Sequence, residues 1–136
     1  MIRSTFIAAC AIVLLIGATP AARAVANGNA RNVPYVIGYH PLHSSQQPFL
    51  GQLHLNFNNG IISGTYTDIS VRPGGPLANA HNVAVSGGLS GSQVTLHIRQ
   101  VTFRGTFSAA KMSGSSTING SIYTWEAQQG SPGSGR

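Results

Sequence analysis

Residues 82–126 read NVAVSGGLSGSQVTLHIRQVTFRGTFSAAKMSGSSTINGSIYTWE, and this stretch decides the fold. A short motif recurs in it: an apolar residue, a spacer, a glycine, and a serine or threonine. The copies, including one upstream, begin at Ile62, Leu89, Phe103, Met112 and Ile118. Apolar and polar residues alternate on either side of possible two-residue turns, which is typical of antiparallel hairpins. The stretch therefore predicts a run of β-hairpins, and it specifies no reaction.

Upstream, Asn59-Gly60 is a strong signal for a type I′ turn, because both residues tolerate positive φ. The turn determines which residues of the flanking strands face each other. The predicted pairs are Phe57 with Ile62, Leu55 with Gly64, and Leu53 with Tyr66. Side chains alternate across a strand with a period of two, so these six residues share one face of the hairpin.

The same reasoning applies within residues 82–126. The predicted turns are Gly91-Ser92, Arg99-Gln100, Ala109-Ala110 and Asn119-Gly120. They place Gly105 opposite Gly114 and Phe103 opposite Ser116. One face then carries Val85, Leu89, Val94, Leu96, Ile98, Val101, Phe103, Phe107, Met112, Ile118, Tyr123 and Trp125. Neither Arg99 nor Gln100 favours positive φ, so a β-bulge within one longer strand is the alternative there.

The rest of the chain completes the sheet. Residues 33–38 predict a strand. Because Pro34 has no N–H to donate, it is expected at the start of a strand or in an edge strand. Residues 40–48 predict a polar loop, and residues 70–81 a long loop of the kind that is often functional or mobile. Together these segments make about eight consecutive strands in an all-β antiparallel meander. Because its apolar face must be covered, we predict an up-and-down barrel, with a two-sheet β-sandwich as the alternative.

The N-terminus has the features of an export signal. Arg3 precedes an apolar run at residues 6–17, and Ala22-Arg23-Ala24 fits a cleavage site. We therefore predict export to the periplasm or the medium after cleavage near Ala24, with an uncleaved anchor as the alternative. The predicted divisions are a signal peptide at 1–24, a flexible leader at 25–32, a β-barrel domain at 33–127 and a disordered tail at 128–136. The one cysteine, Cys10, would leave with the signal, so no disulfide is expected.

Charged residues are sparse, at 7% of the chain against roughly 25% in typical globular domains. The formal net charge of +6 reflects a scarcity of acidic residues. The basic residues Arg72, Arg99, Arg104 and Lys111 are scattered along the chain. Nucleic acid is therefore not expected as a partner. No stretch after the signal is apolar enough to predict a membrane span.

Residues 59–66, Asn-Gly-Ile-Ile-Ser-Gly-Thr-Tyr, resemble the glycine turn and Gly-Thr-Tyr strand of avidin-like proteins. The strand order that follows, ending in a tryptophan strand, is similar as well. The resemblance covers residues 49–126 and implies a small exported eight-stranded barrel with a ligand at its mouth, as in avidins and lipocalins. This chain has only Trp125 where avidins line their biotin site with several tryptophans, and it lacks the Gly-x-Trp strand of lipocalins. No binding residue is carried over.

Few residues could support catalysis or bind a metal. His40 and His43 have a metal-ligand spacing, but Pro41 lies between them and no Cys or carboxylate completes a site. Asp68 and Glu126 are the only acidic residues, and they are expected as separate surface acids at strand ends. No Gly-x-Ser-x-Gly elbow occurs. We predict no enzyme, no metal site and no cofactor. A Zn or Cu site at the histidines and a hydrolase are the less favoured alternatives.

The predicted inner face offers the best candidate site. Its candidate ligand-binding residues are Phe57, Tyr66, Phe103, Phe107, Tyr123 and Trp125. In a small barrel such side chains usually form the core, and the alternative is a cavity for a small apolar ligand. The inward glycines either bend the sheet or leave space for that ligand. The sequence thus predicts a non-catalytic exported binding protein, whose partner is a small apolar ligand or an envelope protein bound by its loops. The alternative is a structural or interaction protein or a secreted inhibitor.

Overall fold

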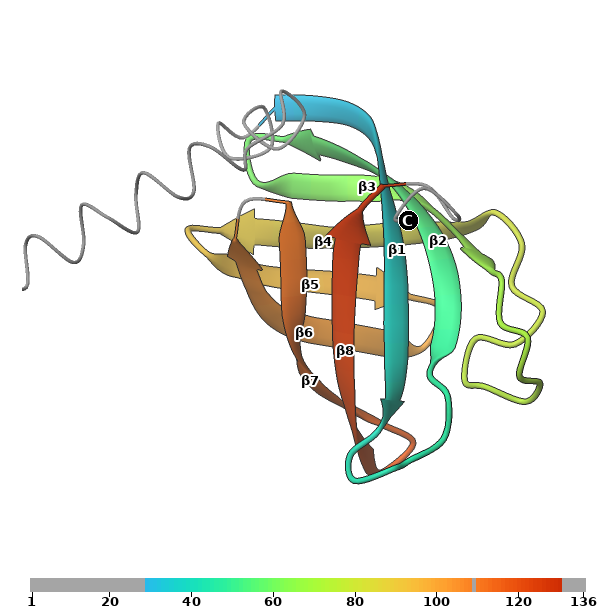
Figure 1. Ribbon diagram of the computed structural model, residues 1–136. Coiled ribbons are helices and arrows are strands. Elements are labelled where there is room, and N and C mark those ends of the chain that lie inside the picture. The colour runs from blue at the N-terminus through green and yellow to red at the C-terminus, as the bar shows by residue number, and fades with distance from the viewer. Residues whose placement is uncertain (1–28, 109, 131–136) are drawn as a thin grey trace, which may run out of the picture.

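The structure is a computed structural model that describes residues 29–108 and 110–130. Its eight strands form one antiparallel sheet that closes into a barrel, with β1 beside β8 (Figure 1). The strands are β1 (Asn29–Pro41), β2 (Phe49–Asn58), β3 (Ile61–Asp68), β4 (Val83–Ser90), β5 (Gln93–Ile98), β6 (Val101–Ser108), β7 (Lys111–Ile118) and β8 (Ser121–Gln129). The predicted barrel is confirmed, and the sandwich alternative is wrong.

The hairpin registers follow from the turn residues as predicted. Asn59 and Gly60 have φ values of 51° and 85°, and Asn119 and Gly120 have 52° and 83°, as a type I′ turn requires. Every pair predicted around Asn59-Gly60 is present in the β2–β3 ladder. The β4–β5 and β7–β8 hairpins also have the predicted registers. Local turn chemistry is therefore sufficient to set these pairings.

The Arg99-Gln100 turn is confirmed and the bulge alternative is wrong, because Ile98 pairs with Val101 directly across the turn. Arg99 takes the positive φ, at 54°. A left-handed conformation costs a non-glycine residue roughly 1–2 kcal/mol. The strand pairing and burial on both sides of the turn outweigh that cost.

Several boundaries differ from the prediction. β1 begins at Asn29, so residues 29–32 of the predicted leader belong to a strand, and it continues to Pro41 through residues predicted as a loop. β8 likewise runs to Gln129, two residues beyond the predicted domain end. The start of β1 is extended by its ladder with β2, where Asn29 pairs with Asn58. The end of β1 and the end of β8 are extended by barrel closure, because Pro41 pairs with Tyr123 and Tyr35 with Gln129. The predicted signal peptide, the start of the leader, Ala109 of the predicted Ala109-Ala110 turn and residues 131–136 of the predicted tail lie outside the described residues.

Pro34 lies inside β1 rather than at its start. It follows an irregularity in the β1–β2 register between Ala30 and Val33, and it precedes Tyr35, where the β1–β8 ladder begins. Pro34 therefore lies at the end of the β1–β8 ladder, where its carbonyl accepts a hydrogen bond from the Gly130 N–H at 2.9 Å and no strand residue of the described chain follows that would need a donor from it. This is the edge-like setting that a residue without an N–H can occupy.

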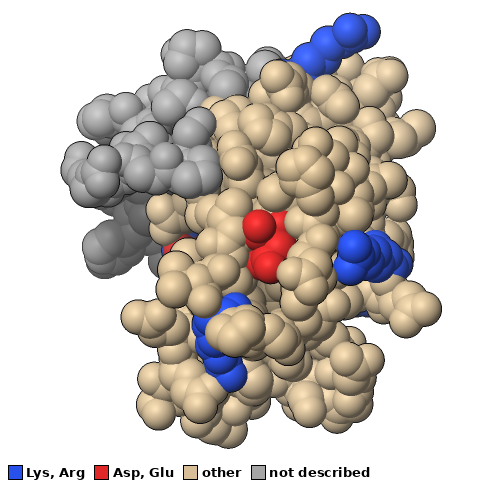
Figure 2. All heavy atoms as spheres, turned by 90° about the vertical axis from the view of Figure 1, so that its right-hand side faces the viewer, with Lys and Arg blue, Asp and Glu red and all other residues tan. Residues whose placement is uncertain are grey.

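The inward face of the sheet forms one hydrophobic core. All twelve residues predicted on the inner face from Val85 onward are buried or pack against the core. The long loop between β3 and β4 contributes Leu77 and Ala80, with 0% and 2% of their surfaces exposed. On the outside, charged side chains are few and stand apart on the face shown in Figure 2.

Candidate functional site

The six aromatic residues predicted to line a cavity all lie on the inward face. Five are buried, and Tyr123 is half-buried against the core. The ring of Phe103 packs edge-on against Tyr39 and Trp125, with centroids 5.4 and 5.5 Å apart, and Phe57 lies 6.5 Å from Phe107. Such spacings are those of aromatic pairs in a packed core. The rings therefore occupy the barrel interior, and a ligand-binding role for them stays a prediction.

The facing glycines Gly105 and Gly114 bring β6 and β7 together. A Cβ atom on Gly114 would overlap the carbonyl oxygen of Arg104, and one on Gly105 would overlap that of Ser113 and lie 2.9 Å from the indole ring of Trp125. Side chains at these positions would force the strands apart or displace the indole. The glycines thus permit close approach of the two strands, and the space above Gly105 is taken by Trp125.

The β3–β4 loop covers one end of the barrel. Leu77 inserts into the core, and the guanidinium carbon of Arg72 lies 4.4 Å from the centre of the Phe49 ring. The carboxylate of Asp68 accepts hydrogen bonds from the main-chain N–H groups of Ser70 and Asn79, at 3.1 and 3.3 Å. The loop that the sequence marks as functional or mobile is held by apolar, cation–π and hydrogen-bond contacts.

Below this loop, two buried tyrosines meet. The hydroxyl oxygens of Tyr39 and Tyr66 are 3.1 Å apart and form a hydrogen bond. Burial raises the pKa of Tyr39 to about 12, although the hydrogen bond to Tyr66 acts in the opposite direction. Burial also raises the pKa of Tyr66, and the nearby Tyr39 and Asp68 raise it further. Both phenols are therefore neutral at physiological pH, and neither can act as a base there.

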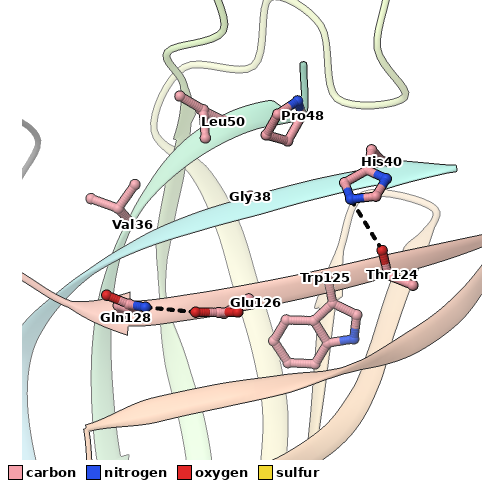
Figure 3. Close-up of a pocket in the computed structure, with 9 residues that line it drawn as sticks. All are labelled: Val36, Gly38, His40, Pro48, Leu50, Thr124, Trp125, Glu126 and Gln128. Carbon is pink, nitrogen blue, oxygen red and sulfur yellow. Dashed lines mark hydrogen bonds between the residues drawn. The ribbon is translucent and has the colours of Figure 1, made fainter. Parts of the chain in front are cut away.

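The outer surface of the barrel carries a groove of about 420 Å³ over β8, β1 and β2. We call it the Gly38 groove, because Gly38 of β1 forms its floor (Figure 3). Gly38 pairs with Leu50 on one side and Glu126 on the other, and it has no side chain to fill the space between them. The lining residues are Val36, Gly38, His40, Pro48, Leu50, Thr124, Trp125, Glu126 and Gln128.

The two walls of the Gly38 groove differ in chemistry. On the β2 side lie the apolar Pro48 and Leu50, whereas the β8 side carries Thr124, Glu126 and Gln128. Glu126 Oε2 accepts a hydrogen bond from Gln128 at 2.6 Å and lies 3.4 Å from Lys111 Nζ. The Gln128 hydrogen bond is the main cause that lowers the pKa of Glu126. The groove is therefore amphipathic, with one carboxylate on its polar side.

His40 closes the groove at one end. Its Nδ1 is 2.9 Å from the carbonyl oxygen of Pro41, which can only accept, so Nδ1 carries the proton. With that single ring proton, Nε2 is an acceptor and faces the hydroxyl of Thr124 at 3.4 Å. The Pro41 carbonyl thereby orients the ring and sets its tautomer. His40 and Thr124 place hydrogen-bonding groups at this end of the groove.

The other histidines lie apart from this groove. His54 and His97 project from the polar faces of β2 and β5, as predicted, and bond Gln52 and Thr102 respectively. Within residues 29–108 and 110–130, no group of three or more His, Cys, Asp or Glu side chains could hold a metal ion. In the same ranges, no helix is long and apolar enough to cross a membrane.

Three comparisons with known proteins return no matching family, no matching curated protein and no matching solved structure. The closed eight-stranded antiparallel barrel agrees with the architecture that the avidin-like and lipocalin-like resemblance implies. Since no relative supports it, the likeness is one of architecture alone.

Sequence reasoning missed the Gly38 groove. One signal was present, because the alternation of β1 places Val36, Gly38 and His40 on the outer face, and a glycine there leaves a hollow. The walls, however, come from β2 and β8. The pairings of β1 with these strands are set by a long connection and by barrel closure, and no turn motif encodes them.

Proposed function

We propose that this protein is a non-catalytic, exported β-barrel that binds a partner protein at the Gly38 groove. The observation that carries the proposal is the contrast between the inside and the outside of the barrel. Inside, aromatic and aliphatic side chains pack against one another. Outside, an amphipathic hollow of about 420 Å³ offers apolar, hydrogen-bonding and anionic groups together.

The chemistry of the walls defines the segment that fits. An apolar side chain placed over Gly38 would contact Val36, Pro48 and Leu50. A hydrogen-bond donor or a cation beside it would meet the carboxylate of Glu126, whose contacts with Lys111 and Gln128 both use Oε2. The expected partner segment thus carries an aliphatic residue next to a basic or amide-bearing one.

The experiment introduces a side chain at Gly38, which would occupy the groove. A Cβ atom at Gly38 would meet only the flexible end of Leu50 closely, at 3.3 Å, so Gly38→Ala and the larger Gly38→Leu should fold. Gly88→Leu is the matched control, because Gly88 is also an outward-facing strand glycine with open space beside it. A Cβ atom at Gly88 would have one atom within 4 Å, the carbonyl oxygen of Gly60 at 3.4 Å. Affinity-tagged protein is incubated with envelope extract of its host, and bound proteins are quantified by mass spectrometry.

A protein retained by wild type and Gly88→Leu but lost with Gly38→Leu is the expected result. It must then bind purified wild type, and not Gly38→Leu, in calorimetry. Equal retention by both variants, or no retained protein at all, would contradict the proposal. Native mass spectrometry of protein purified from its host tests the small-ligand version, since a co-purifying apolar molecule would favour a carrier over a partner-binding barrel.

A further inference from the structure

A second feature of the barrel wall is a gap between β6 and β7. Their ladder contains four pairs, from Ser108 with Lys111 to Gly105 with Gly114, and it stops there. The predicted Phe103–Ser116 pair is therefore not formed. The reason is local: the Arg104 N–H donates to the hydroxyl of Ser116 at 2.9 Å, and the Arg104 carbonyl accepts from the Trp125 indole N–H at 2.9 Å. Side chains replace the strand partner at this position.

Main-chain geometry then shows which groups face the gap. In an antiparallel strand the N–H and C=O of one residue point to the same side, and successive residues alternate. Both main-chain groups of Arg104 bond toward β7 and β8, so those of Thr102 point the same way. By the same count from the Thr106–Ser113 pair, Ser115 and Thr117 point their main-chain groups toward β6. All three residues lie beyond the end of the β6–β7 ladder.

A groove of about 370 Å³ lies on the outside of this gap, and we call it the β6–β7 groove. Its lining residues are Thr102, Arg104, Ser115, Ser116, Thr117 and Ile122. The lining residues thus include one arginine, the hydroxyl-bearing Thr102, Ser115 and Thr117, and one apolar side chain that is half exposed. The Ser116 hydroxyl is buried and bonds the Arg104 N–H, and the Thr102 hydroxyl bonds His97. None of the lining residues is acidic. The two carboxylates of the described chain bond elsewhere, Asp68 within its loop and Glu126 with Gln128 and Lys111.

We propose that the β6–β7 groove is a docking site for an extended acidic segment of a partner protein. The segment adds its main chain to β6 at Thr102 and places a carboxylate on Arg104. Two independent observations select this occupant. Main-chain groups beyond a ladder end are the template that an added strand uses. A guanidinium flanked by hydroxyl groups, with no carboxylate among them, is complementary to an anionic side chain.

The test uses the synthetic peptide acetyl-Thr-Val-Asp-Val-Thr-amide as the probe, with ¹⁵N-labelled protein observed by NMR. The expected result is amide shift changes confined to residues 101–104 and 115–118. Replacing Asp by Asn in the peptide should weaken binding about two- to five-fold, as for a solvent-exposed ion pair. N-methylation of the central amides should weaken it about tenfold or more, because the main-chain bonds are lost.

Protein variants separate the groove from general charge effects. Arg104→Gln should weaken binding of the Asp peptide two- to five-fold and should leave binding of the Asn peptide unchanged. Arg99→Gln is the control, since Arg99 is exposed in the neighbouring turn and does not line the groove. Gly38→Leu should leave peptide binding at the β6–β7 groove unchanged. The peptide experiment therefore tests this proposal separately from partner binding at the Gly38 groove.

The other outcomes overturn the proposal. If acetate alone shifts the same amides and competes fully with the peptide, the groove is a simple anion site. If the N-methylated peptide binds as tightly as its parent, no strand is added. If no peptide produces shifts at residues 101–104 at millimolar concentration, the gap is not a docking site.

Discussion

Replacing Tyr35 by phenylalanine tests directly whether the barrel interior is filled. Tyr35 is fully buried, and its hydroxyl is the one buried side-chain polar atom without a hydrogen-bond partner in the part of the chain that the structure describes. A buried hydroxyl that lacks a partner costs about 1–3 kcal/mol of desolvation. Removing it leaves a void of a single oxygen atom, which costs about a few tenths of a kcal/mol. Tyr35→Phe should therefore raise the free energy of unfolding by about 1 kcal/mol.

The assay is urea and thermal unfolding followed by circular dichroism. A gain of about 1 kcal/mol corresponds to roughly 4–8 °C in Tm for a domain of this size. Tyr66→Phe is the matched control, because the Tyr66 hydroxyl bonds that of Tyr39 at 3.1 Å. That substitution should instead lower stability by about 1 kcal/mol, since it removes the buried hydrogen bond between the two hydroxyls.

A loss of more than about 1 kcal/mol in the free energy of unfolding of Tyr35→Phe would contradict this expectation. Such a loss would mean that the Tyr35 hydroxyl is hydrogen-bonded in solution, by an internal water or by a ligand inside the barrel. The interior would then not be filled by protein alone, and the small-ligand version of the function would regain support.

Four further predictions follow from the same contacts. Gly114→Ala should lower the free energy of unfolding by about 2–3 kcal/mol, because it forces the facing strands apart. Gly88→Ala should change the free energy of unfolding by less than about 0.5 kcal/mol, and equal effects of the two substitutions in urea unfolding would contradict the close approach of β6 and β7. Leu77→Ala should cost about 2–4 kcal/mol if the loop is packed in solution, and an unchanged Tm would show that it is not. Arg99→Gly should raise stability by about 0.5–1 kcal/mol by relieving the positive φ, and a lower midpoint in urea would contradict this. Alkaline unfolding should begin above pH 10, because burial raises the pKa of Tyr39 from 10.0 to about 12. The free energy of unfolding is then highest below pH 10 and falls between pH 10 and 12 by about 1.4 kcal/mol per pH unit for each such tyrosine. A free energy of unfolding that does not change over this pH range would contradict the prediction.

Much of the fold was predictable from the sequence, because hairpin registers are local. A turn such as Asn119-Gly120 has two residues that tolerate positive φ, and the period of two then assigns every neighbour to a face. The inner face from Val85 to Trp125 was predicted in this way and is confirmed. At Arg99-Gln100 apolar parity on both sides required a shift, but a β-bulge would supply that shift equally well, so the structure decided for the turn.

Other features depend on contacts between residues far apart in the chain. The β1–β8 ladder, with pairs such as Tyr39 with Trp125, has no turn to encode its register, and it extends β1 beyond the predicted limits. The Gly38 groove needs β2 and β8 on either side of an outward glycine, so only closure creates it. The gap between β6 and β7 arises because the Trp125 indole, carried by β8, bonds Arg104 on β6.

By itself, the sequence therefore determined the strands, the hairpins and the inward face, since turn φ angles and alternation act over a few residues. Only the tertiary structure decided whether inward glycines such as Gly105 and Gly114 leave space or close it. That outcome depends on how closely the neighbouring strand approaches and on which side chain from a distant strand reaches the glycines. At Gly114 the main chain of β6 takes the space, and at Gly105 the main chain of β7 and the Trp125 indole take it. The candidate binding surface therefore lies on the outside of the barrel.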